Sequence, residues 1–185
     1  KPAKIIRSSE YIKEVDIQNA ISMIREAKRP YILVGGGAVI SDAADELKEF
    51  VDKVDAPVCD TLMGKGAFNG TDERYSGMLG MHGTKASNLG VSHCDFLIAV
   101  GTRFSDRVLG NPKTFAKNAK ILQIDIDPVE INKNICVSAS IIGDVKAVLT
   151  VINRRLEAQE HKEWLETVKE YKESYPLTYD KGRLT

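Results

Sequence analysis

The sequence predicts a three-layer, doubly wound α/β fold, with helices on both faces of a mostly parallel sheet of about five to six strands. Two apolar runs, Tyr31-Ile32-Leu33-Val34 and Phe96-Leu97-Ile98-Ala99-Val100, show no polar alternation, which is typical of strands buried on both faces. Segments with the apolar spacing of helices alternate with such runs. Glycine and polar residues gather where the runs end.

The first third of the chain predicts a helix, a strand, a second helix and a second strand. From Val15, apolar residues recur at the spacing of an amphipathic helix, at Ile17, Ala20, Ile21 and Ile24. The strand over residues 31–34 runs into three consecutive glycines. We expect Ser41 to cap the next helix, whose buried stripe is Leu47, Phe50, Val51 and Val54. Residues 56–59 form a short strand, followed by a glycine-rich loop over 60–68.

Residues 77–84, Gly-Met-Leu-Gly-Met-His-Gly-Thr, are predicted to form a loop. Glycine weakens helix and strand interiors, and methionine suits an irregular apolar surface, so we expect this loop to face a ligand. A helix over 84–91 and strands over 96–100, 121–126 and 140–142 follow, and Asp127-Pro128 opens a short helix. Two final helices bury apolar stripes, at Val148, Leu149, Ile152 and Leu156 and at Trp164, Val168 and Tyr171.

Parallel strands end at one edge of their sheet, and ligands bind beyond that carboxyl edge. The expected elements therefore place five loops on one edge, together with the Gly143-Asp144 turn. The five loops are 35–41, 60–68, 77–84, 101–110 and 125–130.

The 185 residues suffice for one domain, and 26 lysines and arginines balance 26 aspartates and glutamates. This balance gives no indication of nucleic-acid or membrane binding. Without a bilayer-spanning run, a signal peptide or a CxxC pair in the sequence, we expect reduced, mostly buried thiols and a cytoplasmic location.

We expect an interdomain linker over 1–14, a nucleotide-binding domain over 15–157, and a helix and linker toward an absent domain over 158–185.

Two motifs at the carboxyl edge have both a ligand-binding and a purely structural interpretation. Backbone N–H groups of Gly35-Gly36-Gly37 can hold a phosphate, but Ile40 stands where the dinucleotide fingerprint needs a small residue. A tight turn therefore remains an alternative. Arg103 can pair with a phosphate through its planar fork, and a surface Arg/Asp ion pair with Asp106 is the alternative.

Three aspartates lie at the same edge. Asp125 ends a strand, where a carboxylate commonly accepts hydrogen bonds from ribose hydroxyls. Asp127 before Pro128 is interpreted as a helix N-cap, and Asp144 is either an N-cap or a ligand contact. The histidines, His82, His93 and His161, show no metal-ligand spacing, and we find no catalytic motif. The residues alone support a nucleotide-binding α/β domain without an identifiable catalytic group.

The order of these loops resembles the central domain of the acetolactate synthase large (catalytic) subunit, a thiamine-diphosphate-dependent enzyme. The resemblance covers roughly residues 15–157, and the segments at 77–84 and 100–110 are its most specific parts. The segments that carry it are V-G-G-G at 34–37, D-T-L-M-G-K-G-A-F at 60–68, G-M-L-G-M-H-G-T at 77–84, V-G-T-R-F-S-D-R-V-L-G at 100–110, I-D-I-D-P at 124–128 and I-G-D at 142–144.

The resemblance implies a Rossmann-like domain that binds FAD. It also implies a three-domain enzyme that condenses two pyruvates, or pyruvate with 2-oxobutyrate, to an acetohydroxy acid and carbon dioxide in branched-chain amino-acid synthesis. Arg103 would face the FAD phosphates, Asp125 and Asp144 the adenosine end, and Met81 and His82 the flavin. By motif position the full FAD site would comprise Gly35, Gly36, Gly37, Thr61, Leu62, Met63, Gly80, Met81, His82, Gly101, Thr102, Arg103, Asp106, Arg107, Val108, Asp125, Ile126, Gly143 and Asp144.

The resemblance also implies what this chain does not contain. In the family, the activating glutamate lies in the preceding domain, and the GDG…N motif for thiamine diphosphate and Mg²⁺ lies in the following domain. Here Gly143-Asp144 is followed by Val145, so we expect no catalytic or metal-binding residue in this chain. Expected partners are the absent domains, a homodimer or tetramer, and a small regulatory subunit. Alternative functions are a pyruvate decarboxylase- or oxidase-like central domain and a stand-alone nucleotide-binding or NAD-linked domain.

Overall fold

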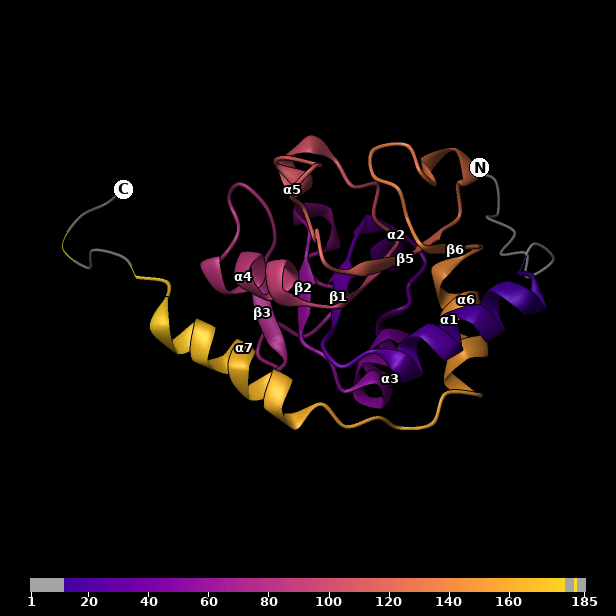
Figure 1. Cartoon of the computed structure of the whole chain (residues 1–185), viewed down its shortest axis with the longest axis horizontal. Coiled ribbons are helices and arrows are strands. Elements are labelled where there is room, and N and C mark those ends of the chain that lie inside the picture. The colour runs from indigo at the N-terminus through magenta and orange to yellow at the C-terminus, as the bar shows by residue number, and fades with distance from the viewer. Residues whose placement is uncertain (1–11, 179–181, 183–185) are drawn as a thin grey trace, which may run out of the picture.

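The computed structural model describes residues 12–178 and 182, and within them six strands form one parallel sheet (Figure 1). The strand order is β3-β2-β1-β4-β5-β6, and all five pairings are parallel. This is the strand order of doubly wound dinucleotide-binding sheets, and it reverses direction between β1 and β4. The strands are β1 Pro30–Val34, β2 Val58–Asp60, β3 Tyr75–Met78, β4 Phe96–Val100, β5 Lys120–Asp125 and β6 Ala139–Ile142.

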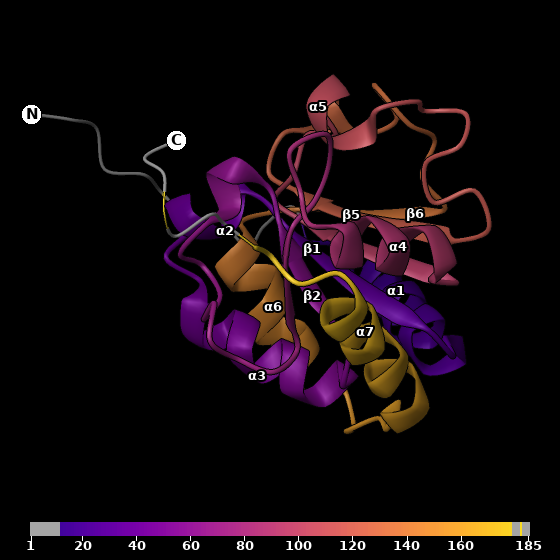
Figure 2. The same cartoon turned by 90° about the vertical axis from the view of Figure 1, so that its left-hand side faces the viewer.

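Helices cover both faces of the sheet, which gives the three expected layers (Figure 2). One layer contains α1, α3 and α6, and the other contains α4 and α7. Short elements follow the carboxyl ends of several strands. The helices are α1 Glu14–Glu26, α2 Gly36–Ile40, α3 Ala44–Val54, η1 Leu62–Gly64, α4 Lys85–His93, α5 Asp106–Leu109, η2 Pro128–Glu130, α6 Val145–Asn153 and α7 Lys162–Ser174.

Strand alternation divides the apolar residues between two cores, one on each face of the sheet. In β1, Ile32 and Val34 pack toward α1, α3 and α6, whereas Tyr31 and Leu33 pack toward α4 and α7. All five residues of β1 and of β4 are buried, which confirms that these runs are central strands. Two of the three cysteines are buried, whereas Cys136 is exposed.

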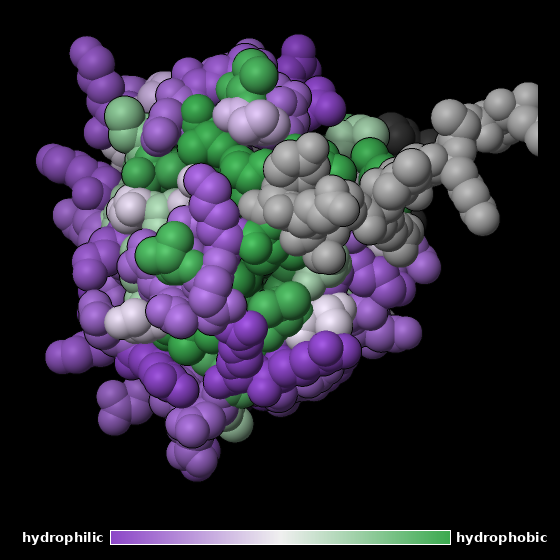
Figure 3. Space-filling model, turned by 90° about the vertical axis from the view of Figure 1, so that its right-hand side faces the viewer, coloured by the Kyte–Doolittle hydropathy of each residue, from purple (hydrophilic) through white to green (hydrophobic). Residues whose placement is uncertain are grey.

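β6 forms one edge of the sheet. Figure 3 shows apolar side chains in the middle of the face at this end of the molecule, framed by hydrophilic residues. Ile12, Ala139 and Val151 are partly buried there and pack against the core shared by α1 and α6. The strand is only four residues long, which limits the backbone it exposes for pairing with another chain.

Two sequence predictions are wrong. Residues 75–78 form strand β3, so the segment over 77–84 is strand at its start and loop only from Leu79. Ser41 does not begin a helix but ends α2, whereas α3 begins after Ala43 without a side-chain cap. The Ser41 hydroxyl instead donates to Asp144 Oδ2 at 2.8 Å. The glycine turn had already started a short helix, so the serine falls at its end.

At the reversal of strand order, the turn after β1 contacts the turn after β4 through backbone alone. The Gly35 N–H donates to the Val100 oxygen at 2.8 Å, and the Gly37 N–H donates to the Gly101 oxygen at 3.0 Å. A Cβ on Gly35 would lie 2.2 Å from the Gly101 oxygen, and a Cβ on Gly37 would lie 2.7 Å from Gly101 Cα. Side chains at these positions would push the two central strands apart.

The segment between α6 and α7 is held by Asp55, the residue that ends α3. The His161 N–H donates to Asp55 Oδ2 at 2.8 Å, and Arg74 donates to Asp55 Oδ1 at 2.8 Å. Burial raises the pKa of the Asp55 carboxyl, but these two hydrogen bonds outweigh it and hold the pKa below its ordinary value. Farther along, the Trp164 ring N–H donates to the Pro30 oxygen at 2.8 Å, which fixes α7 to β1.

Gly35→Ala tests the contact between the two glycine turns. We expect the free energy of unfolding to fall by about 1–3 kcal/mol, because the added methyl group overpacks the strand ends. Urea denaturation followed by the fluorescence of the single tryptophan measures this change. Gly70→Ala is the matched control, since a Cβ there would lie 3.8 Å from the Tyr75 ring, an ordinary contact. Equal losses in both variants would contradict the account.

Asp55→Asn tests the lowered pKa. A carboxyl whose folded pKa is below its unfolded value of about 3.9 stabilises the fold above that value, and this contribution is lost as the pH falls through the folded pKa. We therefore expect Asp55→Asn to lose about 1–3 kcal/mol at pH 7 and to show a weaker decline of stability in acid. Asp45→Asn, an exposed change in the same helix α3, should keep the wild-type profile. Parallel acid profiles for wild type and Asp55→Asn would exclude the role of Asp55.

Candidate functional site

The loops predicted to share one edge do so, at the carboxyl ends of the strands along the upper side of Figure 1. The parallel register places the ends of β1, β4 and β5 side by side, since Val34 pairs with Val100 and Val100 with Ile124. The turn after β6 joins this edge because the Gly143 N–H donates to the Asp125 oxygen at 2.9 Å. The predicted site residues therefore lie on one continuous edge.

The Gly35-Gly36-Gly37 turn has mainly a structural role. Three of the N–H groups at residues 35–38 donate to carbonyl oxygens of the chain: those of Gly35, Gly37 and Ala38. These groups are therefore not available as a phosphate cradle, and the tight-turn interpretation accounts for Gly35 and Gly37. Gly36 has a different neighbour, because a Cβ there would lie 3.0 Å from Met63 Cβ.

The loop from Leu79 to Gly83 lies against the segment that follows β4. The Met81 N–H donates to the Arg107 oxygen at 3.0 Å, and Asn88 Nδ2 donates to the Gly80 oxygen at 3.1 Å. Gly80 has a φ of +104°, and a Cβ there would lie 2.3 Å from the Arg107 oxygen. Both the positive φ and the close approach of the Arg107 oxygen require glycine at residue 80. The Met81 side chain is 71% exposed and His82 is exposed, so this loop presents both to the edge.

The segment after β4 presents two guanidinium groups. Arg103, Asp106 and Arg107 are exposed, and none of the ion pairs within residues 12–178 involves them. The surface ion-pair interpretation is therefore not supported, and both cations can meet an anion. Asn134 Nδ2 donates to the Arg103 oxygen at 3.1 Å and fixes the backbone there.

Phe104 holds this segment in an uncommon backbone conformation. Its φ is +51°, a left-handed value that is costly for a bulky residue, yet its side chain is only 2% exposed. The ring packs edge-on against Phe115 with ring centroids 6.0 Å apart. Aromatic packing therefore offsets the backbone strain and turns the flanking Arg103 and Ser105 outward, since both of these are exposed.

A buried carboxylate lies one strand away. Asp125 is 7% exposed, and its Oδ1 accepts the Asp127 N–H at 3.0 Å. Burial raises the pKa of the Asp125 carboxyl, and the carboxylates of Glu130 and Asp127 add to this rise. Asp127 caps η2 by accepting the Val129 N–H at 3.0 Å, which confirms the N-cap interpretation of Asp127.

Gly143 and Asp144 have strong structural roles. Asp144 is the N-cap of α6, where Oδ1 accepts the Ala147 N–H at 3.2 Å and Oδ2 accepts the Ser41 hydroxyl. A Cβ on Gly143 would lie 2.9 Å from Ile12 Cγ1. The structure thus supports the N-cap interpretation of Asp144, and its contact with a ligand stays a prediction.

The turn after β2 contributes apolar surface. Thr61 is buried, and its Oγ1 accepts the Gly64 N–H at 3.1 Å, so this hydroxyl faces its own turn. Leu62 and Met63, in contrast, are 71% and 74% exposed. Ile126, after β5, is 61% exposed. Large exposed apolar side chains in loops at the carboxyl edge suit a flat aromatic ligand or another protein surface.

The remaining predicted residues line the same turns. Gly101 has a φ of +62° and packs against Gly37. Thr102 is buried, and its carbonyl oxygen accepts from Gln123 Nε2 at 3.1 Å. Val108 is partly buried against the core on the α4 side. These three shape the backbone of the site and offer little exposed polar surface.

Asp60 was not included in the predicted site, although it ends β2 as Asp125 ends β5. It is 4% exposed, and its carboxylate accepts the Tyr75 hydroxyl at 2.8 Å and Lys65 Nζ at 3.3 Å. The hydrogen bond to Tyr75, aided by the Asp60 charge, raises the pKa of Lys65. In the sequence Asp60 stands at a strand end, as Asp125 does, and this position could have marked Asp60 as a further candidate site residue.

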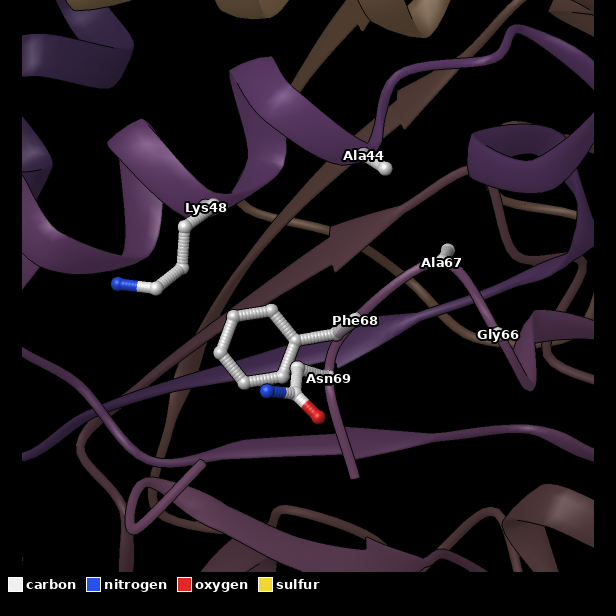
Figure 4. Close-up of a pocket in the computed structure, with 6 residues that line it drawn as sticks. All are labelled: Ala44, Lys48, Gly66, Ala67, Phe68 and Asn69. Carbon is white, nitrogen blue, oxygen red and sulfur yellow. The ribbon is translucent and has the colours of Figure 1, made fainter. Parts of the chain in front are cut away.

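A separate pocket of about 380 Å³ opens beside the first turn of α3 (Figure 4). It is lined by Ala44 and Lys48 and by residues 66–69, and Phe68 forms its apolar wall. None of the predicted site residues lines this pocket. Within the described ranges there is no cluster of histidine, cysteine and carboxylate groups suited to a metal ion, and no helix long and apolar enough to cross a membrane.

Comparison with known proteins agrees with this architecture. Over 167 residues the chain is 49% identical to the "Probable acetolactate synthase large subunit" of Methanocaldococcus jannaschii, covering 88% of this chain and 28% of that protein. It is 43% identical over 176 residues to the "Acetolactate synthase large subunit" of Porphyra purpurea, covering 92% of this chain and 30% of that protein. The Corynebacterium glutamicum protein of the same name is 41% identical over 169 residues, covering 89% and 27%.

The chain spans less than a third of the length of these relatives. Residues 17–152 match the family model described as "Thiamine pyrophosphate enzyme, central domain". The six-stranded parallel sheet and its flanking helices agree with that match. The chain therefore belongs to the family of thiamine pyrophosphate enzyme central domains.

Proposed function

We propose that this chain is the FAD-binding central domain of an acetolactate synthase. The observation that carries the proposal is the set of groups at the carboxyl edge of the sheet. Arg103 and Arg107 are exposed and form no ion pair within residues 12–178, and the backbone of Arg107 bonds to the loop that exposes Met81 and His82. The buried carboxylate of Asp125 ends the next strand. Cations, a carboxylate and apolar side chains are the groups that phosphates, ribose hydroxyls and an aromatic ring require.

Each group has a distinct role in this proposal. The guanidinium of Arg103 binds the pyrophosphate, and the Asp125 carboxylate accepts hydrogen bonds from the ribose of the adenosine end. Met81, His82 and the apolar residues Leu62 and Met63 pack toward the flavin. FAD supplies a flat, redox-capable ring system when bound, although the proposed reaction has no net redox change.

The activity we propose belongs to the whole enzyme. It condenses two pyruvates, or pyruvate with 2-oxobutyrate, to an acetohydroxy acid with release of carbon dioxide, in branched-chain amino-acid synthesis. Thiamine diphosphate and Mg²⁺ act in the other domains, and this chain contributes binding surface and no catalytic residue. The proposed partners are the flanking domains, further copies of the enzyme in a dimer or tetramer, and a small regulatory subunit, in the cytoplasm.

Arg103→Ala tests the phosphate contact. We expect the Kd for FAD to rise by about tenfold or more, because a charge-assisted hydrogen bond to phosphate is lost. Equilibrium dialysis of the chain with FAD measures this, with NAD as a competing dinucleotide that should not displace FAD. Lys113→Ala removes an exposed cation from a nearby loop and should leave the Kd unchanged. An unchanged Kd in Arg103→Ala, or tighter binding of NAD than FAD, would overturn the assignment.

Asp125 makes FAD binding depend on pH. Its pKa is raised in the free chain, and ribose hydroxyls that donate to it favour the ionised form. FAD should therefore bind more weakly as the pH falls through the raised pKa of Asp125, and Asp125→Asn should remove this dependence. FMN, which lacks the adenosine half, is the control ligand and should show no such decline. The same pH profile for FAD in wild type and Asp125→Asn would exclude this role.

A further inference from the structure

Four hydroxyl side chains form a cluster between the sheet and α4, beneath the loop that carries Met81 and His82. They are Tyr31 in β1, Ser76 in β3, Thr84 at the N-cap of α4 and Ser87 in its first turn. Tyr31 and Ser87 are 0% exposed and Ser76 is 5% exposed. Buried hydroxyls are costly unless they are hydrogen-bonded, so the pattern of bonds in this cluster decides what it does.

Ser76 is the centre of the cluster. Its Oγ lies 2.6 Å from the Tyr31 hydroxyl and 2.8 Å from Ser87 Oγ, and it donates to the Val58 oxygen at 2.9 Å. With its proton directed to Val58, Ser76 accepts from Tyr31, and the single proton of the Ser87 hydroxyl is shared between Ser76 Oγ and the Gly77 oxygen. Burial raises the pKa of Tyr31 well above its ordinary value, so the phenol keeps the proton that it donates. The cluster therefore ties β1, β2, β3 and α4 together through one oxygen.

Thr84 connects this cluster to the start of the loop. Its Oγ1 donates to the Ser76 oxygen at 2.8 Å and accepts the Ser87 N–H at 3.1 Å, while Ser87 Oγ lies 3.1 Å from the Gly77 oxygen. Gly77 has a φ of +107°, and a Cβ there would lie 2.3 Å from Thr84 Cγ2. The two ends of the loop, at residues 77 and 84, are thus held in contact.

The ring of Tyr31 occupies a space that helix α4 leaves open. A Cβ on Gly90 of α4 would lie 2.4 Å from Tyr31 Cε2, so the absence of a side chain at Gly90 makes room for the ring. Trp164 packs edge-on against the same ring with centroids 6.3 Å apart. An apolar ring would fill this space equally well, so the hydroxyl of Tyr31 is the part of the side chain that serves the cluster.

We propose that this hydroxyl cluster fixes the conformation of the Leu79–Gly83 loop, and that Tyr31 is a positioning residue for the flavin end of the FAD site. The second half of this inference rests on the proposed function. Tyr31 touches no ligand in this account and acts through Ser76 and Thr84. Loss of its hydroxyl leaves Ser76 without one donor and loosens the two loop ends, which weakens the Met81 N–H bond to the Arg107 oxygen.

Tyr31→Phe tests the positioning of the loop in the chain without FAD. We expect the Met81 amide to exchange its hydrogen at least about tenfold faster, because its bond to Arg107 opens more often. Amides of the central strand β4 should exchange at nearly the wild-type rate. Tyr171→Phe is the matched control: its hydroxyl lies 3.0 Å from His93 Nδ1, away from the cluster, and its loss should leave Met81 unchanged. Equal acceleration at Met81 and β4 would show a general loss of stability and overturn the proposal.

FAD binding gives the second readout. In Tyr31→Phe the Kd for FAD should rise about fivefold. The Kd for FMN should rise by a similar factor, because both ligands contain the flavin that this loop is proposed to contact. A Kd within about twofold of wild type would contradict the role of Tyr31 in the FAD site, even if the loop moves. If wild type binds no FAD, the proposed function fails, and the exchange of Met81 still decides the first half of the inference. Ser87→Ala provides the same tests if Tyr31→Phe does not fold.

Discussion

Backbone contacts between glycine turns determine the shape of the carboxyl edge. Gly35 and Gly37 lie against Gly101 where the sheet reverses its order. Gly64 packs in the same manner on the Val34 oxygen, 2.2 Å from where its Cβ would be, and Gly80 packs on the Arg107 oxygen. Because these turns meet through main chain, neighbouring side chains have no room between them. Leu62, Met63 and Met81, which flank these glycines, face outward, and the edge presents apolar side chains together with two exposed arginines.

The close contact of these turns explains why glycine is required at the contact points. It also determines which groups remain available to a ligand. The N–H groups of Gly35 and Gly37 are used within the fold, so exposed cationic side chains are the stronger candidates for binding an anion. Arg103 and Arg107 are such side chains, and the strained backbone of Phe104 is consistent with a segment shaped for a ligand. These side chains make the carboxyl edge the candidate site on which the proposed function rests.

Much of the fold could be predicted from local pattern, and the failures have physical causes. The runs in β1 and β4 are continuously apolar, so burial on both faces was predictable. β3 has no such run, since Tyr75-Ser76-Gly77-Met78 is stabilised by pairing with β2 and by the hydroxyl cluster, neither of which is local in sequence. The role of Ser41 depends on Asp144, 103 residues later. For the candidate site, the strand ends were enough to predict Arg103 and Asp125, whereas the hydrogen bonds that occupy Asp144 and Thr61 required the structure.

We propose that the carboxyl edge of the sheet binds FAD. The most direct measurement is a map of backbone amide chemical shifts while FAD is added to the chain. If FAD binds there, the shifts should be confined to the ends of β1, β2, β4 and β5 and to the loop from Leu79 to Gly83, with residues 101–108 most affected. Shifts centred on the pocket of Lys48 and Phe68, shifts at the opposite edge of the sheet, or no shifts at all would contradict it.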